Sequence, residues 1–250
     1  PVAAHHAGPD LPIALLPVAS GTGAAAQCGL RSKPRQIGAS LAQSVSCPVT
    51  PLDLLNVADP GAPTRTAFAG VGIASDAELL ATTMAATLPS RISKSGGLGM
   101  TRSLSKPPAR FDVAIDGMNY RCTAIAVLAR HGFGRNLLTD AGKADLAPDA
   151  PLVCVRVETT DRTSLFDLSL SAKFGRFLRD KAVTVSPAHE VEAAGAGLFV
   201  AMDGNTPQAT SQPGIHVGLV PAPSWNTLIV AAELTDLLPA PAPAPQVAAA

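Results

Sequence analysis

Most apolar residues of the chain occur in short runs of strand length, and Gly, Pro, Asn and Asp separate one run from the next. From residue 111 onward, alternation and β-branched content indicate strands. They are predicted at 111–116, 120–129, 152–159, 182–188, 189–194, 198–204, 215–221 and 226–232. The turn residues Asp116 and Gly117 predict a hairpin after the first of them. Many short strands with regular turns favour an antiparallel sandwich or barrel-like domain.

The first 110 residues predict a mixture of strands and helices. The expected elements are a buried strand at 11–17, a Gly-rich turn at 19–23, helices at 24–30 and 36–45, and strands at 49–58 and 64–74. Ser75 then predicts the N-cap of a helix over 75–88. A second long helix is expected over 164–182, with Phe174, Phe177 and Leu178 on one face.

Composition excludes some classes of function. The chain has 250 residues, with 19 basic and 19 acidic side chains, so its net charge is zero. Aromatic residues make up 4%. Neither value favours nucleic-acid binding, which relies on positive charge and base stacking. No apolar run reaches the roughly 18 residues of a membrane-spanning helix.

The four cysteines do not predict a metal site. Cys28, Cys47, Cys122 and Cys154 form no C-x-x-C pair, and the histidines are scattered. Cys154 lies within the apolar run LVCVRV, which predicts a buried strand. We therefore expect reduced thiols in the core.

One segment resembles a motif of the diacylglycerol-kinase-like lipid kinases. Residues 17–30 read PVASGTGAAAQCGL, similar to the family's P-x-G-T-x-N-x-x-A-R-x-x-G-[IL] element. A Gly-permissive turn before a helix exposes backbone N–H groups to which a phosphate can bind. The resemblance implies that Ser20, Gly21 and Thr22 lie near the nucleotide phosphates. The alternative is a structural strand-to-helix turn.

Further segments resemble the same family, in the family's order. They are LDLLNV at 52–57, FAGVGIASDAELL at 68–80, GGLGMTRSL at 96–104, FDVAIDG at 111–117, ADLAPDAPLVCV at 144–155, FVAMDGN at 199–205 and LVPAPSWNTLIV at 219–230. The resemblance covers about 220 residues. The family's GGDGT-type ATP loop is absent from the chain, and the chain begins at Pro1 rather than Met. We therefore expect a fragment whose upstream part carries that loop.

The resemblance implies an α+β fold. We expect residues 1–48 to be the remnant of an α/β nucleotide-binding domain and residues 49–235 to form a mainly antiparallel β-sandwich of the lipid-kinase C-terminal type. Residues 236–250, rich in Pro and Ala, predict a disordered tail.

The resemblance also implies a chemistry, in which a lipid hydroxyl attacks the γ-phosphoryl of ATP with Mg²⁺ present. Asp203, within the family's DGE-like element, is the implied base, and Asp149 is the implied metal ligand. From the local sequence alone, each of these residues also fits an ordinary turn. The implied substrate is diacylglycerol or a related lipid alcohol. The expected location is cytoplasmic, and a homodimer is left open.

Two basic segments bear on a membrane partner. Residues 91–110 carry five basic residues and no acid, and residues 173–181 carry four basic residues beside Phe174, Phe177 and Leu178. A basic amphipathic segment can bind an anionic membrane surface, and the alternative is a solvated face packed on the sandwich.

Two other functions remain open. Ala19, Thr22, Ala26 and Asn205 depart from the family pattern where its chemistry takes place. These departures also fit a catalytically degenerate module that binds a lipid or a partner. An unrelated β-sandwich without a nucleotide role is the third reading.

Overall fold

The computed structural model describes part of the chain. The described residues are 13–14, 49–51, 54–58, 65–67, 70–88, 107–129, 147, 149–203, 205–210, 214–220 and 227–229. The helices predicted at 24–30 and 36–45 lie outside these ranges. The boundaries expected at residues 48 and 235 stay a prediction.

Two six-stranded antiparallel sheets make up most of the described structure. The first, which we call the helix-side sheet, has the order β10 (Val183–Ala188), β9 (Leu152–Val157), β8 (Ala124–Ala129), β5 (Gly70–Ala74), β12 (Phe199–Met202) and β13 (Gln208–Ala209). The second, the outer sheet, has the order β4 (Arg65–Ala67), β3 (Leu54–Ala58), β14 (Gly214–Val220), β11 (Val191–Ala194), β6 (Phe111–Ile115) and β7 (Met118–Cys122).

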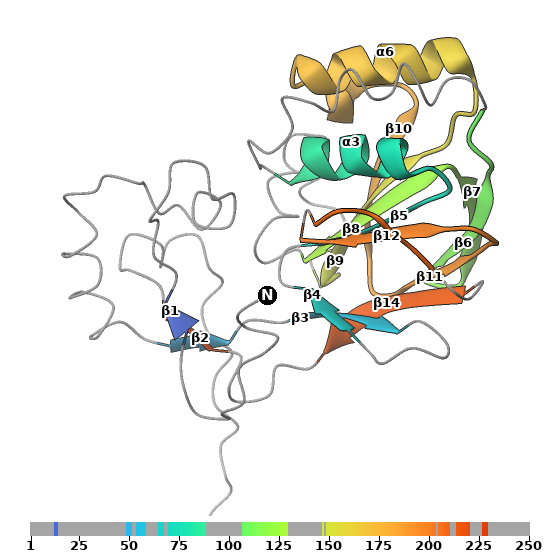
Figure 1. Ribbon diagram of the computed structural model, residues 1–250. Helices are drawn as coiled ribbons and strands as arrows, with labels where there is room; N and C mark the ends of the chain where they lie inside the picture. The colour runs from blue at the N-terminus through green and yellow to red at the C-terminus, as the bar shows by residue number, and fades with distance from the viewer. Residues whose placement is uncertain are drawn as a thin grey trace, which may run out of the picture.

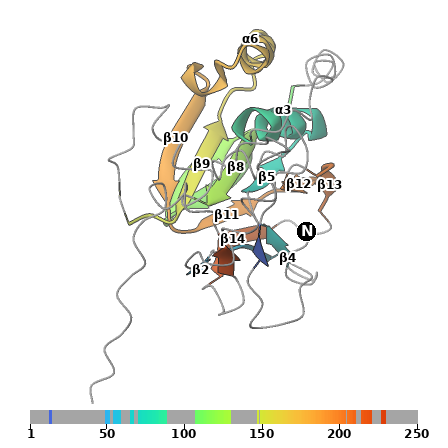
Figure 2. The ribbon, with the colours of Figure 1, turned by 90° about the vertical axis from the view of Figure 1, so that its left-hand side faces the viewer.

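The described residues form three layers (Figure 1). Helices α3 (Ala77–Thr87) and α6 (Arg162–Lys173) cover one face of the helix-side sheet, and the outer sheet packs on its other face. The edge view in Figure 2 shows the same stacking. A small separate sheet joins β1 (Ile13–Ala14), β15 (Thr227–Ile229) and β2 (Val49–Pro51). The α+β fold with mainly antiparallel sheets is confirmed.

The burial pattern of the strands follows from these layers. Strands β5, β8 and β9 are buried at every position because helices cover one face and the outer sheet covers the other. In β8, Ile125 and Val127 face the core between the sheets, whereas Ala126 and Leu128 face the helices. Strands β6 and β11 alternate between buried and solvent-facing residues, as expected for an outer layer.

Three segments that were each predicted as one strand, 49–58, 64–74 and 120–129, are two strands each in the structure. The chain passes from the outer sheet to the helix-side sheet between β4 and β5 and again between β7 and β8, and the predicted strand 49–58 is divided between β2 and β3. At Thr123 the backbone N–H donates to the Val157 carbonyl (2.8 Å), outside the ladder of β7 with β6. Apolar spacing does not distinguish one sheet from the other, so the sequence predicts one continuous strand in each of these three places.

The predicted helix over 164–182 is also two elements. Helix α6 ends at Lys173, Gly175 adopts a left-handed φ of 68°, and the 3₁₀-helix η4 (Phe177–Arg179) follows. Phe177 is buried against the helix-side sheet, whereas Phe174 is 69% exposed. The expected common face of Phe174, Phe177 and Leu178 is therefore wrong, because the left-handed turn rotates Phe177 away from it.

Candidate functional site

Asp203 lies at the end of β12, where it is held against the first residue of β5. Its backbone N–H donates to the Gly70 carbonyl (2.8 Å), and its Oδ1 accepts from the Gly70 N–H (3.2 Å). Strands β5 and β12 are paired through Met202 and Val71, so these two bonds extend the ladder by one residue. The carboxylate is thus fixed at a strand end in the middle layer.

The turn after β12 places Asp203 in the left-handed region, with a φ of 54°. Asp is among the non-glycine residues that adopt this conformation most readily. The Asn205 N–H donates to the Met202 carbonyl (2.9 Å), which closes the turn. Asp203 is thus a carboxylate at a strand end, as expected, and it is also part of a tight turn, as the alternative proposed.

The predicted phosphate-binding residues Ser20, Gly21 and Thr22 lie outside the described residues. Their place near Asp203 stays a prediction. Among the basic residues of 91–110, Arg110 is described and exposed, and the others lie outside.

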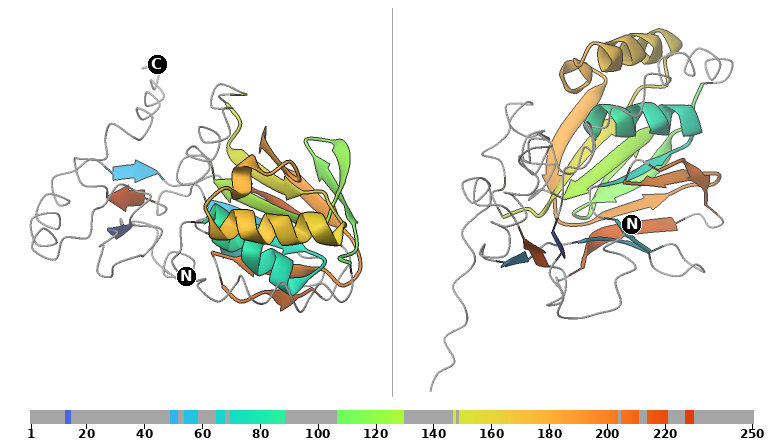
Figure 3. Two further views of the ribbon diagram at one scale, coloured as in Figure 1. Left: turned by 90° about the horizontal axis from the view of Figure 1, so that it is seen from above. Right: turned by 60° about the vertical axis from the view of Figure 1, so that its left-hand side comes forward.

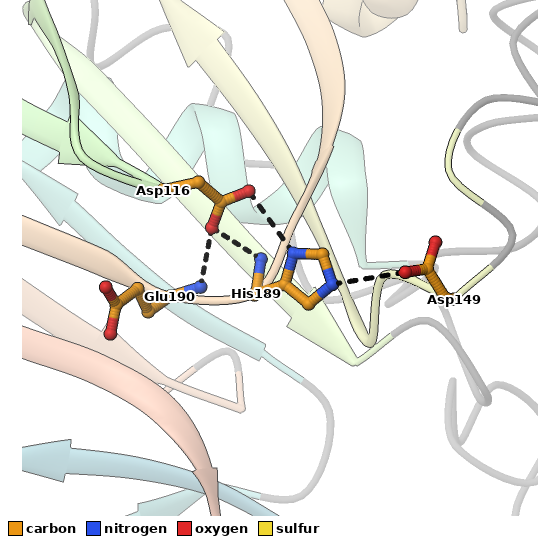
Figure 4. A network of polar contacts seen from close by, with 4 residues as sticks. All are labelled: Asp116, Asp149, His189 and Glu190. Carbon is orange, nitrogen blue, oxygen red and sulfur yellow. Dashed lines mark hydrogen bonds and ion pairs between the residues drawn. The ribbon is translucent and has the colours of Figure 1, made fainter.

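Asp149 lies in a turn before β9, closed by a hydrogen bond from the Ala150 N–H to the Ala147 carbonyl (3.0 Å). Its side chain is 78% exposed, and its Oδ2 lies 3.7 Å from Nε2 of His189. Figure 4 shows His189 between Asp149 and Asp116. Nδ1 of the same ring lies 3.4 Å from Oδ2 of Asp116. A neutral imidazole has one N–H and can donate to one of the two carboxylates at a time.

Asp116 joins the β6–β7 hairpin to the start of β11. Its Oδ1 accepts from the backbone N–H groups of His189 (2.8 Å) and Glu190 (3.0 Å). Burial raises the pKa of Asp116, but the N–H donors of Glu190 and His189 and the His189 ring outweigh burial and lower the pKa overall. The carboxylate therefore stays ionised while it holds two segments of the outer sheet together.

The described residues do not form a magnesium cage around Asp149. They contain no group of three or more His, Cys, Asp or Glu placed to hold a metal ion. A ring nitrogen of His189 lies beside Asp149, and Mg²⁺ prefers oxygen ligands in octahedral geometry.

The sequence predicts a turn at Asp116 but gives no link between Asp116 and His189. These residues are 73 positions apart, and no spacing motif joins them. The pairing of β6 with β11, in which Ile115 lies opposite Val191, brings them together. Only the register of the sheet could have indicated the cluster.

Comparison with known proteins supports the fold. No family model matches the chain, and no curated protein matches it. Two solved structures of proteins from Bacillus anthracis str. Sterne, assigned as diacylglycerol kinases, are similar to it. One has a TM-score of 0.55 at 13% identity, over 89% of this chain and 69% of that one. The other has a TM-score of 0.53 at 14% identity, over 87% of this chain and 69% of that one.

The chain has the fold of these diacylglycerol kinase structures. The family resemblance found in the sequence motifs is thus confirmed at the level of the fold, because the matched region covers nearly all of the chain. A smaller likeness, with a TM-score of 0.46 at 13% identity, is to an NAD kinase from Archaeoglobus fulgidus, over 81% of this chain and 64% of that one. Among the described helices, none is long and apolar enough to cross a membrane.

Proposed function

We propose that the chain is part of an ATP-dependent lipid kinase that transfers a phosphoryl group to the hydroxyl of diacylglycerol or a related lipid alcohol. The observation that carries the proposal is the shared fold, together with a carboxylate held at the end of a middle-layer strand where the family motif would place one. Such an enzyme would act in the cytoplasm, at the membrane surface where its substrate lies.

Asp203 is the proposed base. In the reaction the lipid hydroxyl attacks the γ-phosphorus, the bond to the β–γ bridging oxygen breaks, and the hydroxyl proton passes to the Asp203 carboxylate. The hydrogen bond from the Gly70 N–H to Oδ1 fixes the orientation of this carboxylate, which reduces the cost of positioning it in the transition state.

The nucleotide phosphates are proposed to lie near Ser20, Gly21 and Thr22. Mg²⁺ would neutralise their charge during transfer. Asp149 is a proposed ligand of this Mg²⁺. It would supply one carboxylate, and phosphate oxygens and water would complete the coordination of the ion. The 250 residues alone are expected to be inactive, because the GGDGT-type loop is not among them.

The test is phosphoryl transfer from labelled ATP to diacylglycerol in mixed micelles by the longest natural form of the protein that contains these residues. Asp203→Asn is the sharpest variant. It keeps an oxygen that can accept from Gly70 and tolerates a left-handed backbone, but it cannot take a proton. We expect a loss of about a hundredfold to a thousandfold in kcat with unchanged thermal unfolding.

Two controls separate a base from a structural role. Asp203→Ala should lose the same activity and should also lower stability, because the Gly70 N–H loses its acceptor. Asp112→Asn, on the exposed β6–β7 hairpin, should leave the rate unchanged. An Asp203→Asn protein that keeps most of its activity would show that Asp203 is not the base.

The second candidate is a binding module without catalysis. It is favoured by one observation: the contacts of Asp203 with Gly70 and the Asn205 bond to Met202 account for the turn in purely structural terms. A folded protein that transfers phosphate to no lipid, yet binds diacylglycerol-containing micelles, would support this function instead.

A further inference from the structure

The outward face of α6 carries a continuous apolar stripe. Phe166 is 43% exposed, Leu170 is 39% exposed and Phe174, at the C-cap, is 69% exposed. They are four residues apart, and at 100° per residue each step turns the stripe by only about 40°. The three side chains therefore lie in one line along the helix.

The opposite side of α6 packs on the helix-side sheet. Leu165 and Leu168 are buried against the helix-side sheet. Figure 3 shows α6 as the outermost element of its layer, so no described element covers the stripe. Within the described part of the chain, the only other exposed large hydrophobic residue is Met118, on β7. An apolar stripe of this kind marks an interaction surface.

A pocket with basic residues in its lining lies beside α6, between the helix and the segment that follows it. After the left-handed Gly175 the chain turns back, and Arg176, Arg179 and Lys181 line a pocket of about 360 Å³ beside α6. Ser164 and Ser171 also line the pocket, but their hydroxyls already donate to Asp161 (3.0 Å) and Asp180 (3.0 Å). The basic side chains are therefore the phosphate ligands that the pocket offers.

Two carboxylates also line this pocket, and one of them is engaged by the protein. Asp180 accepts from the Ser171 hydroxyl (3.0 Å) and from the Ala182 N–H (3.0 Å), so it closes the turn. Asp167, which is exposed, is the other. Over residues 161–181 there are five basic and three acidic residues, which gives a net charge of +2 in a chain whose total is zero.

We infer that α6 and the turn to Lys181 form a docking surface for a membrane that contains anionic phospholipid. The stripe of Phe166, Leu170 and Phe174 enters the boundary between headgroups and acyl chains, and the basic pocket takes a lipid phosphate. An apolar stripe beside excess positive charge is complementary to an apolar layer beneath anionic headgroups. The inference rests on the proposed function in that a lipid kinase must reach its substrate at a membrane. Binding of this surface to the membrane does not itself require phosphoryl transfer.

The structure also changes which residues are expected to insert. The sequence predicts Phe177 and Leu178 on the apolar face, but Phe177 is buried against the helix-side sheet and Leu178 is partly buried there. Phe166 and Leu170, from the preceding turns of α6, take their place.

The experiment is sedimentation of the 250-residue chain with vesicles, comparing phosphatidylcholine alone with a mixture of phosphatidylcholine and phosphatidylserine. We expect binding to the mixed vesicles that weakens as salt is raised. Phe166→Ser with Phe174→Ser should weaken binding by roughly tenfold or more. Arg176→Gln with Arg179→Gln should weaken binding to mixed vesicles, and Asp167→Asn should strengthen it.

Matched controls come from the β6–β7 hairpin of the outer sheet and the residue that precedes it. Met118→Ser removes an equally exposed apolar side chain, and Arg110→Gln with Arg121→Gln removes two exposed charges. Both should leave binding unchanged, and thermal unfolding should verify that every variant is folded. A wild-type chain that does not bind mixed vesicles, or a stripe variant that binds as well as wild type, overturns the proposal.

The stripe of α6 could instead be covered by a second copy of the chain. In that case the wild-type chain sediments as a dimer, the stripe variant sediments as a monomer, and neither binds vesicles. This result overturns the proposal. Kinase activity of the longest natural form toward a short-chain, water-soluble diacylglycerol should be the same with and without the stripe substitutions. Failure of docking is thereby distinguished from failure of the proposed catalysis.

Discussion

At the scale of single residues, backbone conformation explains where the polar groups lie. Asp116 and Asp203 both adopt a left-handed φ, of 50° and 54°. Each follows a strand, and each uses its carboxylate to accept backbone N–H groups of another segment. The Asp-Gly sequence of the β6–β7 hairpin was recognised from the sequence, because left-handed turns favour these residues. The long-range partners were not.

Asp116 should make the stability of the outer sheet sensitive to acid. Because its pKa is lowered in the folded protein, its contribution is present above the ordinary range of an Asp and is lost as pH falls through the folded pKa. Asp116→Asn keeps an oxygen acceptor but no charge. We expect the difference in unfolding free energy between wild type and Asp116→Asn to shrink as pH is lowered from about 7 to about 3, as measured by urea unfolding.

A suitable control for Asp116 is Asp112→Asn. Asp112 pairs with Arg121 on the surface (3.2 Å) with a side chain that is 71% exposed, and such pairs contribute little to stability. A pH-independent difference for Asp116→Asn would contradict the role given to its carboxylate.

At the scale of elements, the sequence located most strands and the two described helices but not all of their ends. Helix α3 was expected to begin with Ser75 as its cap. In the structure Asp76 is the N-cap, and its Oδ1 accepts from the N–H groups of Glu78 (3.0 Å) and Leu79 (2.9 Å). The Ser75 hydroxyl instead donates to the Ala109 carbonyl (2.6 Å). Two adjacent capping residues cannot be ranked without knowing which other segment lies near.

Asp76→Ala should therefore destabilise the protein by about 1 kcal/mol, the usual cost of losing an N-cap acceptor. Asp76→Ser should recover most of this loss, because its hydroxyl oxygen can still accept. Chemical denaturation of the two variants and of wild type measures both values. If Asp76→Ala leaves the free energy of unfolding unchanged, the helix end is held by its packing on β5 and β8 rather than by the cap.

At the scale of the whole molecule, the packing of the two sheets determines how accessible the core thiols are. Cys122 and Cys154 are free and fully buried, as the sequence reading expected, and both face the core between the two sheets. Burial raises the pKa of Cys122 to about 12 and raises that of Cys154 as well, although Arg156 opposes this in both cases. Cys28 and Cys47 lie outside the described residues.

These two thiols should react only when the sheets separate. In a Cys28→Ser, Cys47→Ser variant, we expect labelling by a thiol reagent to follow global unfolding, so its rate should rise in parallel with denaturant-induced unfolding. Rapid labelling of the native protein would show that the sandwich opens locally beside β7.

The strand-rich character, the turns, the buried cysteines and the likeness to lipid kinases could all be predicted from the sequence, because these features depend on local spacing and residue type. The tertiary structure decided which sheet each strand joins, because apolar runs are the same for either layer. It also brought His189 to Asp116 and Asp203 to Gly70, through strand register across long separations. Finally, it decided which aromatic residues of α6 face solvent, because the left-handed turn at Gly175 ends the helix before Phe177.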